Sequence, residues 1–134
     1  MTQFPSPDME ITRHLVISDL ETSKAWCRDV LGAELTGEYG GTSAVFKLLG
    51  AWILITTGGE PTPDKPSATF APPPDPDTVS AQMIFRVQDT PAIYELLTSR
   101  GAEFLTPPVR NGSEVRAFFR DPDGHLFEIS AIDA

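Results

Sequence analysis

The sequence lacks the features that mark several large classes of protein. It has a single cysteine, Cys27, so no disulfide can form within the chain, and this fits a reducing compartment. No apolar run approaches the roughly 20 residues needed to cross a bilayer, and residues 1–10 do not resemble a signal peptide. We therefore expect a cytoplasmic protein without a membrane-spanning helix.

Basic residues are also scarce. The 134 residues include 10 Lys and Arg against 19 Asp and Glu, which gives a formal net charge of −9. Such a charge repels phosphate backbones and anionic lipids, so nucleic acid and membrane surfaces are disfavoured as partners. Hydrophobic residues make up 40 % of the chain, which is enough for the core of one domain spanning residues 1–134.

Two halves of the chain repeat one order of predicted elements: a strand, a helix and three strands. The junction between helix and second strand reads LGAEL at 31–35 and RGAEF at 100–104. An internal repeat is a stronger sign of fold than local propensity. The predicted strands are 11–17, 33–39, 43–49 and 51–57, then 82–87, 103–109, 114–120 and 125–131, with helices at 20–31 and from Pro91 to Arg100.

The repeat predicts an α+β fold of two βαβββ modules, at residues 9–57 and 79–132. The linker between them, residues 58–78, contains seven of the 13 prolines. Proline cannot donate a hydrogen bond to a sheet and favours extended chain. The linker is therefore either an inert spacer or a segment whose Phe70 packs over a cavity or against a second subunit.

Strand side chains alternate between two faces, so residue parity divides each strand into two sets. One set is apolar, as at Leu15, Phe85 and Phe127, and is expected to lie under the helices. A packed core does not tolerate unpaired charges, and a fully exposed face has no need of large apolar groups. The mixed set is therefore expected to line a partly polar cavity, as in small-molecule sites. Its members are His14, Val16, Trp52, Leu54, Gln82, Ile84, Arg86 and Glu128.

Two segments resemble the vicinal oxygen chelate superfamily, which includes glyoxalase I, extradiol dioxygenases and bleomycin-resistance proteins. They are residues 18–32, SDLETSKAWCRDVLG, and residues 119–128, FRDPDGHLFE. The resemblance implies an eight-stranded, incompletely closed curved sheet around a cavity, with the helices outside, and a homodimer. It is specific for the fold and weak for the reaction, because one scaffold hosts many chemistries.

Metal-dependent members of that superfamily usually hold a divalent ion with a first-strand imidazole and a last-strand carboxylate or amide. By resemblance, Glu128 stands at the carboxylate position of the second module, and Gln82 stands where its histidine is usually found. In the first module Leu54 replaces the last-strand ligand, and His14 lies two residues after the usual position, Thr12. The resemblance thus implies either no cofactor or one Zn, Ni, Mn or Fe ion held by an incomplete set: His14, Gln82 and Glu128.

One function that fits is metal-free binding of a small metabolite or drug in the cavity between the modules, similar to bleomycin-resistance proteins. Trp52 and Phe118 would stack on the ligand beside Leu54, and Arg86 and Arg116 would bind an anionic group. The absence of ligands at two metal positions favours this function.

The alternative is a divalent-metal-dependent lyase or isomerase similar to glyoxalase. Glu128 would be a metal ligand or a catalytic base, with His14 as a second ligand. The carboxylate retained at residue 128 favours this function. An extradiol dioxygenase fits less well, because it would need two inward-facing histidines and the chain has two in total.

These candidates also have structural explanations. Glu128 can pair across the sheet with Arg86 or Arg116, which would satisfy a buried carboxylate. His14 can be a half-exposed strand residue.

Two further residues are expected to be structural. His125 follows the tight turn at 121–124 and is interpreted as part of that turn. Cys27 lies on a helix and is expected to be a core residue, not a nucleophile.

Overall fold

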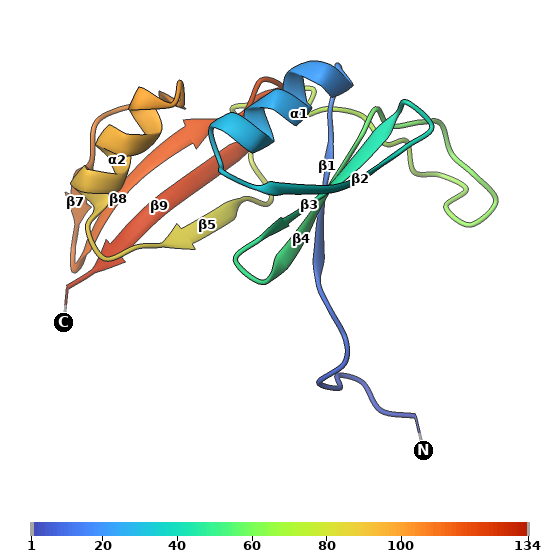
Figure 1. Ribbon diagram of the computed structural model, residues 1–134, viewed down its shortest axis with the longest axis horizontal. Helices are drawn as coiled ribbons and strands as arrows, with labels where there is room; N and C mark the ends of the chain where they lie inside the picture. Colours follow the sequence, from blue (N-terminus) through green and yellow to red (C-terminus); the bar gives the residue numbers. More distant parts are fainter. Residues whose placement is uncertain (1, 134) are drawn as a thin grey trace.

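The computed structural model describes residues 2–133 and contains both repeated halves (Figure 1). The α+β class is confirmed. The first half contains β1 (Thr12–Val16), α1 (Leu20–Asp29), β2 (Glu34–Tyr39), β3 (Ser43–Leu48) and β4 (Ala51–Thr56). The second half contains β5 (Met83–Arg86), α2 (Thr90–Ser99), β6 (Glu103–Phe104), β7 (Val109–Asn111), β8 (Glu114–Arg120) and β9 (Leu126–Ile132).

The strands form two unclosed sheets, with the orders β1-β4-β3-β2 and β5-β9-β8-β6, and β7 pairs with β8. In each half the first strand runs parallel to the last, while the other pairs are antiparallel. Within residues 2–133 no backbone ladder joins β1 to β5. The strands expected in one eight-stranded sheet are therefore divided into sheets of four and five.

One predicted strand, 103–109, is interrupted in the structure. Strand β6 ends at Phe104 and β7 begins at Val109, so Pro107 and Pro108 lie between them. Proline lacks the N–H that a ladder requires, which explains the interruption. The prediction of one strand here is wrong, and the ninth strand results from this break.

Helix α2 begins as the sequence predicts. The Asp89 carboxylate accepts a hydrogen bond from the Ala92 N–H at 3.1 Å, and Pro91 occupies the first turn, where a missing N–H costs nothing. Gly101, with φ at +102°, follows the helix and turns the chain toward β6. Figure 1 shows both helices on the same side of the molecule.

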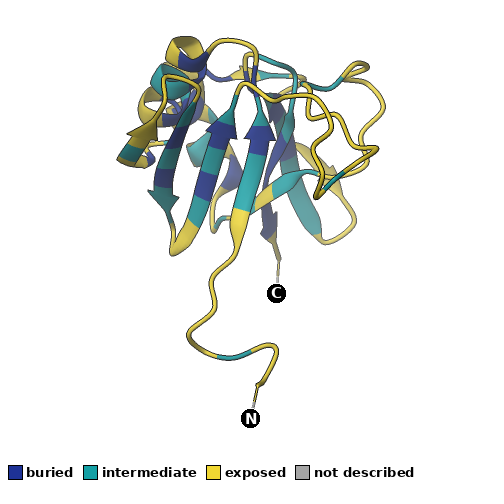
Figure 2. Ribbon diagram, turned by 90° about the vertical axis from the view of Figure 1, so that its right-hand side faces the viewer, coloured by how far each residue is buried: buried dark blue, intermediate teal, exposed yellow. Residues whose placement is uncertain are grey.

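The two halves share one hydrophobic core under the helices. Trp26 of α1 lies 5.2 Å from Phe127 and 6.2 Å from Phe119 of the second sheet, measured between ring centroids. The apolar set that parity assigned in β1, β4 and β9 is buried, although Glu128 and Ser130 of the opposite set are buried in β9 as well, and Figure 2 shows the alternation of burial along the first sheet. The buried residues of the predicted apolar set are Leu15, Ile17, Ile53, Ile55, Phe127 and Ile129, and Cys27 is buried as predicted.

Candidate functional site

The mixed face of the second sheet carries its polar side chains in rows. The strand register places Ile84, Glu128 and Phe118 in one row across β5, β9 and β8. The next row along the strands is Arg86, Ser130 and Arg116. Side chains in register on adjacent strands share a face, so both rows belong to one surface, here called the polar face. Residues two apart along a strand are about 7 Å apart.

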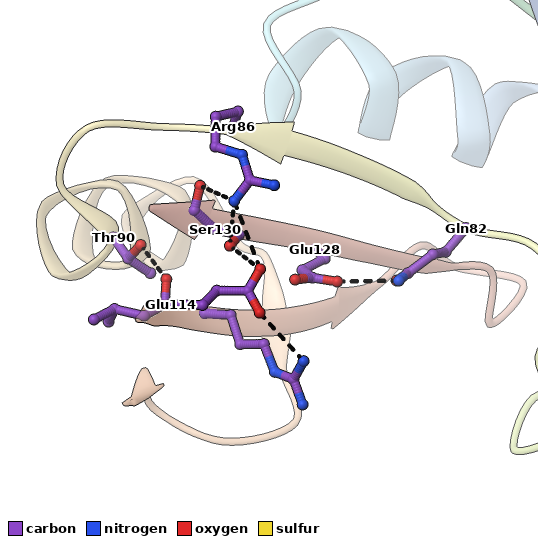
Figure 3. A network of polar contacts seen from close by, with 8 residues as sticks. Gln82, Arg86, Thr90, Glu114, Glu128 and Ser130 are labelled. Atoms are coloured by element: carbon purple, nitrogen blue, oxygen red, sulfur yellow. Dashed lines mark hydrogen bonds and ion pairs between the residues drawn. The ribbon is translucent and has the colours of Figure 1, made fainter. Parts of the chain in front are cut away.

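Glu128 is buried on the polar face, with 4 % of its surface exposed. Its Oε1 accepts a hydrogen bond from Gln82 Nε2 at 3.0 Å (Figure 3). Gln82 Oε1 is buried and has no hydrogen-bond partner within residues 2–133. A carboxylate and an unpaired amide oxygen therefore lie side by side, and both are acceptors. Such a pair matches a ligand that donates hydrogen bonds.

The neighbouring row is a cationic network. Arg86 Nη1 donates to Ser130 Oγ at 2.7 Å, and that hydroxyl donates to Glu114 Oε2 at 2.6 Å (Figure 3). Arg86 and Arg116 lie 3.6 and 3.4 Å from the same carboxylate. The hydrogen bond from Ser130, followed by the charges of Arg116 and Arg86, holds the pKa of Glu114 below its usual value. Two guanidinium groups share one carboxylate, so one positive charge is left over.

Because both arginines pair with Glu114, they do not pair with Glu128 as the sequence had suggested. Arg116 also lies over the Phe118 ring at 5.2 Å. The sequence analysis did not identify Glu114 or Ser130. Strand parity could have placed both residues on the polar face, because Glu114 shares the face of Arg116 in β8, and Ser130 shares the face of Glu128 in β9.

The candidate residues of the first half lie on the other sheet. Trp52 Nε1 donates to the Glu10 carboxylate, and Lys47 Nζ lies 3.9 Å from the Trp52 ring centroid. Trp52 and Leu54 line a shallow hollow on the first sheet, together with Val45, and no residue of the second sheet lines it. Trp52 also lines a second hollow, of about 250 Å³, together with Ile84 and Arg86 of the second sheet. One chain therefore brings Trp52 close to Arg86 of the polar face, whereas the hollow that Leu54 lines contains no residue of the second sheet.

His14 occupies a third place. Its Nε2 lies 2.7 Å from Thr56 Oγ1, and partial burial lowers the pKa of its imidazole. It lines a cavity of about 430 Å³ beneath the linker, and Glu128 and Gln82 do not. Residues 2–133 contain no group of three or more His, Cys, Asp or Glu placed to hold a metal ion.

The C-terminal part of the linker is held by one side chain, Arg120. Its Nη1 donates to the carbonyls of Pro76 at 2.7 Å and Gly124 at 2.9 Å, and its Nη2 contacts Asp77 at 3.1 Å. A Cβ on Gly124, whose φ is +91°, would lie 2.9 Å from Pro76 Cβ. Only glycine therefore lets the turn before β9 approach the linker this closely.

The middle of the linker packs beside β1. Gly59 and Phe70 exchange two backbone hydrogen bonds of 2.9 Å, and the Phe70 ring meets His14 edge-on at 5.1 Å. Gly58, with φ at +85°, passes so close to the Phe70 carbonyl that a Cβ would collide with it. Phe70 thus packs on His14, which lines the cavity, while the cavity wall itself begins at Ala71, and this contact favours the second interpretation of the segment over an inert spacer.

His125 has the turn role that the sequence indicated. The backbone N–H of His125 donates to Asp121 Oδ1 at 2.8 Å, and its imidazole Nδ1 lies 2.7 Å from Asp121 Oδ2. It also lines the cavity beneath the linker, which the sequence analysis did not foresee.

Comparison with known proteins agrees with this architecture. Residues 10–129 match the family model of the Glyoxalase/Bleomycin resistance protein/Dioxygenase superfamily. No curated protein matches the sequence. Within residues 2–133, no helix is long and apolar enough to cross a membrane.

Several solved structures have the same fold at low sequence identity. A glyoxalase/bleomycin resistance protein/dioxygenase from Nocardioides is 21 % identical with a TM-score of 0.69, over 96 % of this chain and 85 % of that chain. A glyoxalase-related enzyme from Fulvimarina pelagi is 20 % identical with a TM-score of 0.70, over 92 % and 88 %. A mutant of the fosfomycin resistance protein FosX from Listeria monocytogenes, in complex with Mn(II) and a dihydroxypropylphosphonic acid, is 22 % identical with a TM-score of 0.63, over 92 % and 89 %.

The family model covers nearly the whole chain, and these structures share its fold. The chain belongs to the glyoxalase/bleomycin resistance protein/dioxygenase superfamily.

Proposed function

We propose that the protein binds a small molecule on the polar face of its second sheet. The observation that carries the proposal is the pair of Glu128 and Gln82, a buried carboxylate beside a buried amide oxygen without a partner. Buried acceptors of this kind are costly unless a donor satisfies them. A bound ligand that donates hydrogen bonds supplies that donor.

The charge pattern of the polar face defines the ligand further. Arg86 and Arg116 carry the surplus positive charge, and both side chains are accessible, with 52 % and 36 % exposed. Glu128 lies in the adjacent row, about 7 Å away along the strand. The preferred ligand therefore has an anionic group and an amine or hydroxyl donor about 7 Å apart. Phe118 offers an aromatic surface between them.

Titration calorimetry with zwitterionic and anionic aromatic compounds tests this proposal. Glu128→Gln keeps the shape of the side chain and removes its charge, so affinity for the zwitterions should fall roughly 10- to 100-fold, as expected for loss of a hydrogen bond to a charged group. Arg116→Met should weaken both classes of compound. Arg110→Met on β7, where Arg110 pairs with Asp133, is the control and should leave affinity unchanged. Equal binding by all three variants would refute the proposal.

A metal-dependent lyase or isomerase is the alternative, since the FosX complex contains Mn(II). In this chain Glu128 and Gln82 offer two oxygen donors, whereas a protein-held divalent ion such as zinc takes three or four protein ligands. His14 lines a different cavity from these two residues. The residues of one chain therefore do not fit such an ion, and the proposal contains no metal-dependent step.

Elemental analysis of protein purified without added metal decides between the two functions. The binding proposal expects substoichiometric metal that does not change in Glu128→Ala. One equivalent of Zn, Ni, Mn or Fe that disappears in that variant would favour the metal-dependent function, with Glu128 as ligand or catalytic base.

Trp52 shares a hollow with Ile84 and Arg86 within one chain, whereas Leu54 would join this site only in an assembly. A homodimer, expected by resemblance, would allow the first sheet of one copy to approach the polar face of the other. Exposed apolar side chains beside the polar face support such a contact, among them Ile84, Leu105 and Ile132, each about half exposed or more. Light scattering coupled to size exclusion should give twice the monomer mass, and a monomer would remove Leu54 from the proposed site.

A further inference from the structure

We infer that the cavity beneath the linker is a second, separate binding site, which takes an aromatic molecule carrying one or two oxygen substituents. The cavity lies between β1, the linker and the start of β9, and its volume is about 430 Å³. That volume falls in the usual range for small-molecule sites. None of the polar-face residues lines it, so this inference goes beyond the proposed function.

Both histidines of the chain line this one cavity. They come from opposite halves, His14 from β1 and His125 from the turn before β9. Each imidazole is oriented by a neighbour that occupies one ring nitrogen: Thr56 binds His14 Nε2, and Asp121 binds His125 Nδ1. The other ring nitrogen of each has no protein partner within residues 2–133. Two oriented imidazoles are thus available to hydrogen-bond a ligand.

A third polar group lines the same space. Arg13 lines the cavity from β1, as it also lines the smaller hollow beside Ile84 and Arg86, and its Nε is buried without a hydrogen-bond partner in the part of the chain that the structure describes. A buried guanidinium N–H that lacks an acceptor is costly, and a ligand oxygen can supply that acceptor. This observation is independent of the histidines and indicates a phenol or carboxylate oxygen on the ligand.

The rest of the lining is mainly apolar and rigid. It includes Val16, Leu126 and Phe127 from the strands, Pro73 and Pro74 from the linker, and Val79 directly after the linker. Prolines have a fixed φ and lose little entropy on binding, so they form a shaped wall. An aromatic body fits such a wall, and its oxygen substituents would meet the arginine and the imidazoles.

The covering linker is already fixed in position before any ligand binds. Arg120 holds it at Pro76 and Asp77, and Phe70 packs on His14 at the other end. A prearranged wall reduces the entropy that binding must overcome. Protein interiors contain few voids larger than a water molecule, so a cavity that these contacts keep open indicates a binding site.

NMR of the imidazole groups provides a direct test, because two histidines give two resolved sets of signals. Titration with salicylate, which carries a carboxylate and a phenol on one ring, should shift both sets with a single dissociation constant. Val79→Trp, directly after the linker, fills the cavity and should weaken binding at least 10-fold. Val109→Trp, at a similarly exposed valine on β7, is the matched control and should bind as the wild type does.

The outcomes separate this inference from the proposed function. Glu128→Gln should leave the salicylate titration unchanged, because Glu128 does not line the cavity. Salicylate shifts that persist in Val79→Trp, or no shift of either imidazole at millimolar salicylate, would overturn the second site. Shifts lost in both Val79→Trp and Glu128→Gln would mean that the two surfaces form one site, which also overturns it.

Discussion

The contact of Trp26 with Phe127 predicts that the two halves of the chain are energetically coupled. Trp26 belongs to α1 in the first half, whereas Phe127 belongs to β9 in the second and is 1 % exposed. Their rings are 5.2 Å apart, within the range in which aromatic pairs contribute about 0.5–1.5 kcal/mol beyond their buried area. Replacing both residues should therefore cost less than the sum of the two single replacements.

Leucine is the suitable substitute because it keeps each site apolar. Phe127→Leu removes part of a buried ring and should lower the free energy of unfolding by about 1–2 kcal/mol, less than the 3–5 kcal/mol typical of truncation to alanine. Trp26→Leu should have a similar effect, since Trp26 also touches Phe119. The double variant should then be about 0.5–1.5 kcal/mol more stable than additivity predicts.

Urea unfolding followed by far-UV circular dichroism measures this coupling, because the signal does not depend on the tryptophan that is removed. Phe70→Leu combined with Trp26→Leu is the control, because Phe70 packs on His14 in the linker. That pair should be additive within about 0.3 kcal/mol. If Trp26 and Phe127 were additive to the same degree, the halves would pack without coupling and the argument from the shared core would fail.

Three further predictions follow from individual side chains. Burial raises the pKa of the Cys27 thiol to about 12, so a thiol reagent at pH 8 should modify it only after unfolding in guanidinium, and rapid labelling of native protein would contradict its burial. Arg120→Met removes the hydrogen bonds that hold the linker and should accelerate its cleavage by proteases, whereas Arg110→Met should not. The lowered pKa of Glu114 stabilises the folded state above the usual value of 4.5, and this contribution is lost as the pH falls through the folded-state pKa. The wild type should therefore melt above Glu114→Gln at pH 7, the difference should shrink by pH 3, and a constant difference would refute the assignment.

The sequence predicted the features that depend on local pattern. Strand β8 has the predicted bounds, 114–120, because its alternation is regular and a hairpin turn precedes it. The helix start at Asp89 and the burial of Cys27 were predicted for similar reasons. The interruption at Pro107 and Pro108 was missed because the surrounding apolar residues made the segment resemble one strand.

The relations between the halves could not be predicted in the same way. Periodicity assigns a face to each residue but does not say which opposing element covers that face. The pattern therefore did not indicate that His14 and His125, which belong to opposite halves, line one cavity. This relation depends on how the two sheets are oriented, and the repeat contains no information on that orientation. Within the second sheet, parity places Arg86 and Arg116 on the face of Glu128, but it does not say which carboxylate of that face their side chains reach, and in the structure this is Glu114.

Because the two halves share one core, their association does not depend on an intact linker. Trp26 and the hydrogen bond of 3.4 Å from Arg100 to the Val30 carbonyl join the halves away from the connecting segment. A protein nicked between residues 61 and 68, or co-expressed as two polypeptides, should hence remain a non-covalent complex. Insertions in this stretch would lengthen the loop that the Gly59–Phe70 bridge closes, while the cavity wall from Ala71 onward and the buried aromatic contacts stay intact.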